Sequence, residues 1–468
     1  MNEKKENEMS FLTKTRLLTP LLAALVLAGC ANVPVAEPHA LPATPAAFKK
    51  HQALPGAATQ AQLEWWKTFA DPQLDALTAQ ALAHNTSLQA ATARLAQARA
   101  LLKNADANRL PQLGAQGGAA RQGGDAAQQR GSSYNVGLAA SYELDLVGRL
   151  SQASRAARLD AQAAESLLAG ARLLVQADVA QTYFALRALD AERALVRETV
   201  AAYRDTLKLT ERRHAAGDIA ELDVARVRTE VASTEAQALA LDRRRSELET
   251  ALAVLVGELP ASLAVAEGQW TETLPLVPAG LPSSMLARRP DIAAAQAGYQ
   301  AAQQRLGVAQ KAWFPTLNLT ATAGGVSPEL SDLFKSSAGL WGVNALLSLP
   351  LFDGGRREAG VQNAAAQADE AAARYREQVL LAFKDVEDQL SGLALLAAQR
   401  EVQAQAVASA QRALQLSDSR YRNGLVSQLE LLDARRSELA NRRQALQVRA
   451  AQYQSTIALI KALGGGWG

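Results

Sequence analysis

The sequence predicts an α+β membrane protein in which very long helices and short strands occur in a duplicated arrangement. Three observations lead to this fold class: two long proline-free stretches rich in alanine, several short segments that alternate polar and apolar residues, and a constant spacing between matching motifs. The chain has 468 residues, of which 49% are hydrophobic, so it has enough apolar material for a sizeable core.

Each of the two long stretches is predicted to form one uninterrupted helix. Residues 150–216 and 357–423 cover 67 positions each and consist mainly of Ala, Leu, Gln, Glu and Arg, which are good helix formers. At about 1.5 Å per residue, such a helix is roughly 100 Å long. A globular domain of this size is narrower than that, so the helices are expected to lie together in an extended bundle or tube.

Each long helix is expected to end at a glycine and to turn back as an antiparallel hairpin. Gly217 and Gly424 stand where a left-handed C-cap would open the turn. In both returning helices, apolar residues recur at alternating steps of three and four, which is typical of coiled coils. The exceptions at these core positions are Thr234, Arg245, Arg436 and Arg443. From this pattern alone, a periplasmic coiled-coil scaffold remains an alternative.

The chain contains two copies of one unit, each with a helix, two strands, a long helix, a turn and a returning helix. Matching residues are separated by 207 positions in three pairs: Gly217 and Gly424, Ser141 and Ser348, Gly257 and Gly464. The spacing indicates duplicated halves. The predicted division is a first copy at residues 61–257, a linker at 258–284, a second copy at 285–464 and a tail at 465–468.

Short alternating segments predict strands with one apolar face. In residues 134–146 the even positions are apolar or aromatic, and residues 316–325 and 341–349 alternate in the same way, whereas residues 112–124 are assigned mainly from the repeat. Strands of this kind form membrane β-barrels, although a soluble sheet with one buried face is the alternative. Four strands cannot close a useful barrel, and open edges cannot lie in lipid, so three copies are expected to share twelve strands.

The N-terminus is predicted to be a lipoprotein signal peptide covering residues 1–29. Basic residues precede a 13-residue apolar run, residues 17–29, which is shorter than the roughly 20 residues that a transmembrane helix needs. Leu27 to Cys30 resemble a bacterial lipobox, which predicts lipid attachment at Cys30; an ordinary signal with a chance cysteine is the alternative. The non-acidic Ala31 implies delivery to the outer membrane. Residues 30–60, which hold five prolines, are expected to form a lipid-anchored tether.

Composition and motifs argue against several function classes. The 49 basic and 46 acidic side chains leave a charge of only +3, which does not favour nucleic-acid binding. One cysteine and four separate histidines form no recognisable metal site, and no phosphate-binding loop or catalytic constellation occurs. The chain is therefore predicted not to be an enzyme and to need no cofactor.

Several long motifs, in the same order along nearly the whole mature chain, resemble those of outer-membrane factors of the TolC type, in the lipoprotein branch that includes OprM and NodT-like channels. The motifs are WWKTFADPQLDALTAQALAHNTSLQAA, SYELDLVGR, LARRPDIAAAQ, QKAWFPTLNLTATAGG, SLPLFDGG and SRYRNGLVSQLELLDA. The resemblance implies a homotrimer whose twelve-stranded outer-membrane β-barrel, with four strands per protomer, is continuous with a long periplasmic α-helical barrel. It also implies an equatorial belt formed by the segments near Trp65 and by residues 258–284.

The resemblance further implies a passive efflux channel that works with a periplasmic adaptor and a proton-driven inner-membrane pump of the resistance-nodulation-division class. A duct for type I protein secretion and a non-pore scaffold are the alternatives. Drugs, organic solvents, siderophores and metal cations are all compatible with such a duct.

Acidic residues just beyond the two turns are candidates for a periplasmic gate. Asp223 follows the first turn, and Glu430 and Asp433 follow the second, where the resembled channels carry gate aspartates. Three copies of each carboxylate around an aperture would repel one another and attract cations. The alternative is that acids near a helix start only stabilise the helix dipole. Gly217, Gly424, Tyr421 and Arg422 are candidate adaptor contacts, with packing of the turn as the alternative for the last two.

Overall fold

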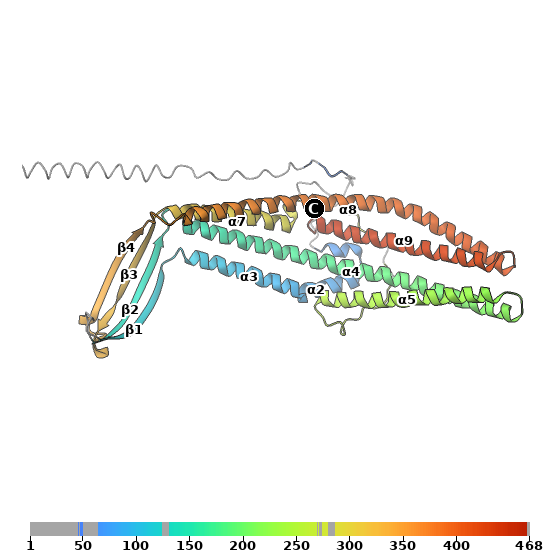
Figure 1. Ribbon diagram of the computed structural model, residues 1–468, viewed down its shortest axis with the longest axis horizontal. Coiled ribbons are helices and arrows are strands. Elements are labelled where there is room, and N and C mark those ends of the chain that lie inside the picture. Colours follow the sequence, from blue (N-terminus) through green and yellow to red (C-terminus); the bar gives the residue numbers. More distant parts are fainter. Residues whose placement is uncertain are drawn as a thin grey trace, which may run out of the picture.

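The computed structural model describes residues 45, 47–49, 64–123, 131–268, 270, 274–278 and 286–465. The molecule is a long rod with four strands at one end and two helical hairpin turns at the other (Figure 1). The proposed signal peptide, Cys30 and residues 466–468 lie outside the described residues. Among the residues that are described, none of the helices carries an apolar stretch of the length and hydropathy needed to cross a bilayer.

Each half of the chain contains a helix, two strands, a long helix and a returning helix, in that order. The first half contains η1 (Trp65–Phe69), α2 (Pro72–His84), α3 (Thr86–Ala107), β1 (Gln112–Gln122), β2 (Gly131–Leu144), α4 (Arg149–Ala215) and α5 (Glu221–Val256). The second half contains α7 (Pro290–Gln310), η2 (Lys311–Trp313), β3 (Thr316–Ser327), η3 (Leu330–Asp332), η4 (Ser336–Ala338), β4 (Gly339–Ser348), α8 (Arg356–Arg422) and α9 (Gln428–Ala462).

The two long helices confirm the length expected from the sequence. Both α4 and α8 have 67 residues, and each begins one residue earlier than predicted. Gly148 (φ 74°) and Gly355 (φ 88°) stand directly before them in the left-handed region, where glycine is favoured because it lacks a Cβ. Each helix therefore starts abruptly where the chain leaves the sheet.

The four strands form one antiparallel sheet in the order β1-β2-β3-β4. The register aligns the apolar rows, since Leu144 pairs with Leu317 and Leu317 pairs with Leu347. This face carries Leu113, Ala115 and Ala119 from β1, Tyr134, Val136, Leu138, Ala140, Tyr142 and Leu144 from β2, Leu317, Leu319, Ala321 and Ala323 from β3, and Trp341, Val343, Ala345 and Leu347 from β4.

The opposite face carries mainly Gln, Asn, Ser, Thr and Gly, with Ala120, Ala139, Val326, Leu340 and Leu346 as apolar exceptions. On the apolar face, Trp341 is 82% exposed and Val343 is 72% exposed. A soluble sheet would bury this face against another layer, and in the described protomer the β4 part of the face has no such cover. The outer strands β1 and β4 each pair on one side only, so the protomer has two open edges.

The main core lies at mid-length, where the start of the first half packs on the long helices. Phe69 and Phe184 have ring centroids 4.9 Å apart, and Tyr453 of α9 lies 4.7 Å from Phe184. Trp65 is fully buried in this cluster, and Trp270 from the segment between α5 and α7 packs 5.1 Å from Tyr453. The segments expected to form a belt therefore contact the helix layer at one level.

Close contacts hold the end of α5 against α2, and part of the proline-rich segment against α8. Gly257, with φ 79°, ends α5, and a Cβ there would stand 2.5 Å from the carbonyl oxygen of His84, so glycine is required for both reasons. From the proline-rich segment, the Phe48 side chain is buried against Phe383 of α8. Part of the expected tether thus packs on the helices.

A buried ion network attaches the segment after α5 to α4. Asp190 is 4% exposed and binds Arg187 and Arg193 at 3.3 Å and Arg245 of α5 at 2.8 Å. Arg187 donates to the backbone carbonyl of Ala266, and Arg245 donates to that of Val265. Arg245, an exception to the coiled-coil pattern, is therefore explained by this network.

We predict that Asp190→Asn loosens the segment at residues 258–268. Removing one partner of a buried ion network leaves uncompensated charge and typically costs about 3–5 kcal/mol. Hydrogen exchange of these residues measures the loss of protection. Asp205→Asn is the matched control, because Asp205 is on the same helix but is 77% exposed beside Lys208, so its effect should be under about 0.5 kcal/mol. Equal protection in both variants would show that the network does not hold the segment.

Candidate functional site

The two hairpin turns lie together at the end of the rod opposite the sheet (Figure 1). The hydrogen bonds follow the same pattern in both turns. In the first turn, Asp218 N–H donates to Arg213 O and Gly217 N–H donates to His214 O, each at 2.9 Å. In the second turn, Leu425 N–H donates to Arg420 O at 2.8 Å and Gly424 N–H to Tyr421 O at 3.0 Å. This is the Schellman arrangement, which the glycine C-caps predicted.

Gly217 and Gly424 adopt φ values of 81° and 70°. A Cβ at either position would meet no atom within 4 Å, so the requirement for glycine is conformational and not steric. Both turns project into open space from the described protomer. They are the exposed tips of the rod.

Tyr421 connects the two hairpins inside the bundle. Its side chain is buried, and its hydroxyl donates to Gln428 Oε1 at 3.2 Å. The Gln428 amide in turn donates to Thr210 Oγ1 of α4 at 3.0 Å. The Arg213 guanidinium lies 5.4 Å from the Tyr421 ring centroid. Packing, one of the two interpretations of Tyr421, is therefore what its side chain does in the protomer.

Arg422 has the opposite character. Its side chain is 73% exposed, and its Nε lies 2.9 Å from Asp418 Oδ2, one helical turn earlier. Asp418 also faces Arg435 of α9 at 3.5 Å, which joins the two helices of the second hairpin. Arg422 is thus a surface cation at the tip.

Two of the three candidate gate acids, Asp223 and Glu430, lie in the first turns of the returning helices, and Asp433 lies in the second turn of α9. Asp223 Oδ1 is 3.5 Å from Arg226, and Asp433 Oδ1 is 3.4 Å from Arg436. Glu430 is exposed, and its backbone N–H is capped by Ser427 Oγ at 3.4 Å. Within the described residues no cation lies at ion-pair distance from Glu430. The carboxylates of Asp223 and Asp433 are thus each matched by an arginine three residues later.

The repeat shows that the two tips differ in charge. At the spacing of 207 residues, Glu430 matches Asp223, but Asp433 matches Arg226, and Arg436 matches Thr229. The position of Asp433 and Arg226 therefore carries opposite charges in the two hairpins. The second hairpin places the additional acid near the tip.

Arg436 also joins the second hairpin to the first. Its guanidinium donates to Glu230 of α5, and this bond raises the pKa of Arg436. Beside it, burial raises the pKa of Tyr203 to about 12, with the nearby Glu230 carboxylate acting in the same direction. Arg436 thus bridges Glu230 and Asp433, one acid from each hairpin.

A second arginine of α9 repeats this link closer to mid-length. Arg443 Nη2 lies 2.6 Å from Glu192 of α4, and its Nη1 donates to Gln237 of α5. In the sequence, Arg436 and Arg443 stand out only as interruptions of an apolar pattern. Their position on the seam between helices was the available signal that they pair with acids across it.

No metal centre accompanies these residues. Throughout the described ranges, no three His, Cys, Asp or Glu side chains lie together in a way that could hold a metal ion.

Comparisons with known proteins point to one family. The sequence model of the outer membrane efflux protein family matches residues 77–258 and 281–465. The chain is 36% identical to the pyoverdine export outer membrane protein OpmQ of Pseudomonas aeruginosa, over 96% of this chain and 97% of the relative. It is 33% identical to the cation efflux system protein CusC of Escherichia coli K12, over 96% and 99%.

A solved structure agrees with this result. The outer-membrane channel OprN superposes with a TM-score of 0.85 at 30% sequence identity, covering 92% of this chain and 98% of that one. The agreement spans the sheet and the long helices together, because both chains are covered almost completely.

We predict that Gln428→Leu destabilises the hairpin tips. The substitution keeps a similar side-chain size but leaves the Tyr421 hydroxyl without its acceptor and removes the donor to Thr210 Oγ1, which costs about 1–3 kcal/mol. Hydrogen exchange at the ends of α4 and α8 should become faster. Gln415→Leu, at an exposed position of α8, is the control and should leave the exchange unchanged. Identical exchange in the two variants would exclude the link as a stabilising contact.

Proposed function

The chain belongs to the outer membrane efflux protein family, and we propose that three copies of it form one sealed duct across the outer membrane and the periplasm. The protein is an outer-membrane efflux channel. In the proposed trimer, each protomer contributes four strands to a twelve-stranded β-barrel and its long helices to a periplasmic α-helical barrel. The main support is the sheet, which combines an exposed apolar face with two open edges.

The antiparallel order of the sheet is compatible with closure by identical copies. Since β1 and β4 run in opposite directions, β4 of one protomer can pair antiparallel with β1 of the next. Closure would give every edge backbone group a partner, which lipid cannot supply. The apolar rows would then face lipid and the amide and hydroxyl rows would line the lumen.

The duct is proposed to be passive. The chain has no phosphate-binding loop, so we assign the free energy of transport to an inner-membrane pump of the resistance-nodulation-division class, connected through a periplasmic adaptor. The adaptor would contact the tips at Gly217, Gly424 and Arg422, with Tyr421 supporting the turn from inside. The duplicated halves at residues 61–257 and 285–464, joined by residues 258–284, would supply the two hairpins.

Lipid attachment at Cys30, with residues 30–60 as the tether, would fix each protomer to the outer membrane. Acyl chains add membrane affinity in proportion to their buried methylene groups. The two relatives compared above are named for pyoverdine and for cations. We therefore propose small molecules as the cargo, since the two names share no narrower chemical class.

The tips are proposed to form the periplasmic gate. Three copies of Glu430 and Asp433 around the axis would attract cations and repel one another, and Asp223 would add three more acids. Arg436 would hold the closed state, because it binds Asp433 while joining the second hairpin to Glu230 of the first. Opening would require these contacts to separate.

We expect the purified protein to form cation-preferring channels in planar bilayers, and the Glu430→Ala, Asp433→Ala double variant to lose that preference and to open several times more often. Losing six carboxylates from one aperture removes the local cation attraction and one side of the Arg436 bridge. Single-channel recording in a salt gradient measures both quantities.

Glu221→Ala is the matched control, because Glu221 is also an acid in the first turn of a returning helix. An effect limited to the helix dipole amounts to about 0.3–1 kcal/mol and should be similar in both variants. If open probability and cation selectivity are unchanged in the double variant, the gate assignment is wrong. If the wild-type protein forms no channels, the proposed duct itself is contradicted.

A further inference from the structure

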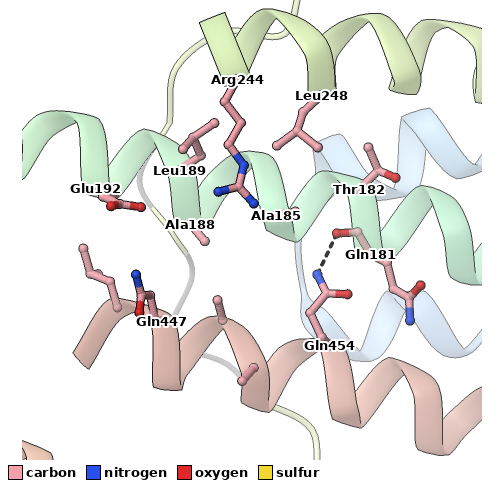
Figure 2. Close-up of a pocket in the computed structure, with 13 residues that line it drawn as sticks. Gln181, Thr182, Ala185, Ala188, Leu189, Glu192, Arg244, Leu248, Gln447 and Gln454 are labelled. Atoms are coloured by element: carbon pink, nitrogen blue, oxygen red, sulfur yellow. Dashed lines mark hydrogen bonds between the residues drawn. The ribbon is translucent and has the colours of Figure 1, made fainter. Parts of the chain in front are cut away.

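A half-open cavity of about 530 Å³ lies at mid-length between three helices. Figure 2 shows α4 crossing the middle of the view, with α5 above it and α9 below it. Its volume is within the range of about 300–1,000 Å³ that is typical of small-molecule sites. The walls combine apolar side chains, such as Ala188 and Leu248, with the amides of Gln181 and Gln454.

The cavity is on the opposite face of α4 from the segments that cover the rod. Tyr183 and Arg187 face those segments, because they contact Asp71 and the Ala266 carbonyl. The α4 residues that line the cavity are Gln181, Thr182, Ala185, Ala188, Leu189 and Glu192. Gln181 and Ala185 each stand two residues before Tyr183 and Arg187, which is about 200° around a helix with 3.6 residues per turn.

This placement decides which side the cavity faces in the proposed duct. The covering layer of η1, α2 and residues 258–268 would obstruct the passage if it lay inside, so it belongs on the outer surface. The opposite face of α4 is then the lumenal one. The cavity also lies over α4, which packs between α5 and α9, so it is away from the α8 side of the protomer.

The charges around the cavity do not cancel. Glu192 lines it, but its carboxylate is bound by Arg443 at 2.6 Å. Arg244 reaches from α5 into the cavity (Figure 2), and in the described part of the chain no acidic group lies at ion-pair distance from it. The cavity therefore presents one uncompensated guanidinium beside apolar walls and amide groups.

The geometry points to a binding site for amphipathic organic anions in the wall of the duct. The anion would bind the Arg244 guanidinium through a carboxylate, sulfonate or phosphate, and its apolar body would lie on Ala185, Ala188 and Leu248. Amides from Gln181, Gln447 and Gln454 would take neutral polar groups of the same molecule. This inference rests on the proposed duct and adds a chemical class of cargo that would bind at this level of its wall.

The test uses the full-length protein in lipid nanodiscs, with 2-naphthoate as the anionic probe and 2-naphthamide as its uncharged analogue. Equilibrium dialysis at pH 7, with empty nanodiscs as the background, should show naphthoate bound at least fivefold more tightly than naphthamide. Arg244→Gln should weaken naphthoate binding to the level of naphthamide. Arg243→Gln, whose arginine pairs with Glu247 outside the cavity, should bind as the wild type does.

A second variant tests the position of the site independently of charge. Ala188→Leu reduces the cavity volume and should weaken both probes at least threefold, without loss of channel conductance. Equal naphthoate binding by the wild type and Arg244→Gln would overturn the inference. Failure of Ala188→Leu to assemble would also overturn it, because the cavity would then be part of a contact between copies.

Conductance of the same preparations distinguishes failure of the anion site from failure of the proposed duct. A preparation that conducts but does not bind naphthoate would contradict only the anion site. A preparation that neither conducts nor binds would contradict the duct and, with it, the site.

Discussion

The constraint on which the structure depends is the hydrogen bonding of the backbone at the edges of the sheet. Four strands leave β1 and β4 each with one row of unpaired amide and carbonyl groups, while their apolar residues are exposed on one face. In lipid, each unpaired group costs several kcal/mol, and in water, the apolar face would aggregate. Both problems are solved if identical protomers pair edge to edge, as we propose. In that assembly, the requirement for pairing comes from the sheet.

The helices carry this arrangement away from the membrane. Because α4 and α8 start directly at the sheet and run for 67 residues each, the positions of the strands and of the distant tips are linked by rigid elements. Arginines on α9 then join the second hairpin to the first through Glu230 and Glu192. Ion pairs of this kind can separate without disrupting the apolar seam beneath them, which suits a contact between parts that move. Buried Asp190 has the opposite role, since it fixes a covering segment in place.

Most of the fold could be predicted from local patterns. Proline and glycine positions set the limits of α4 and α8 to within one residue, and the alternation of residues 134–146 identified the apolar face of β2. β1 was recognisable only through the repeat, because glycine and alanine fill much of its apolar row. The pairing of β2 with β3 lies beyond local patterns, since α4, α5 and α7 lie between them in the chain.

The candidate site was predictable to a lesser degree. The glycine turns and first-turn acids follow from short-range rules of helix capping. The partners of Arg436 and Gln428 do not, because Glu230 and Thr210 are 206 and 218 residues away in sequence. An arginine at an apolar position indicates that an acid is near but does not identify it. Arg244 gave no signal at all, since an exposed arginine on a helix is ordinary until the fold places it at a cavity between three helices.

Disulfide trapping between strand edges tests most directly whether three identical protomers close one barrel. Cysteine would replace Gly118 of β1, combined in turn with Cys at Gly342, Asn344 or Leu346 of β4, all on the polar face of the sheet. Closure by three copies predicts that one combination yields covalent dimers and trimers in native membranes and no larger species, while the single variants stay monomeric on denaturing gels. Monomers in every combination, or a ladder that continues beyond the trimer, would show that three copies do not close one barrel.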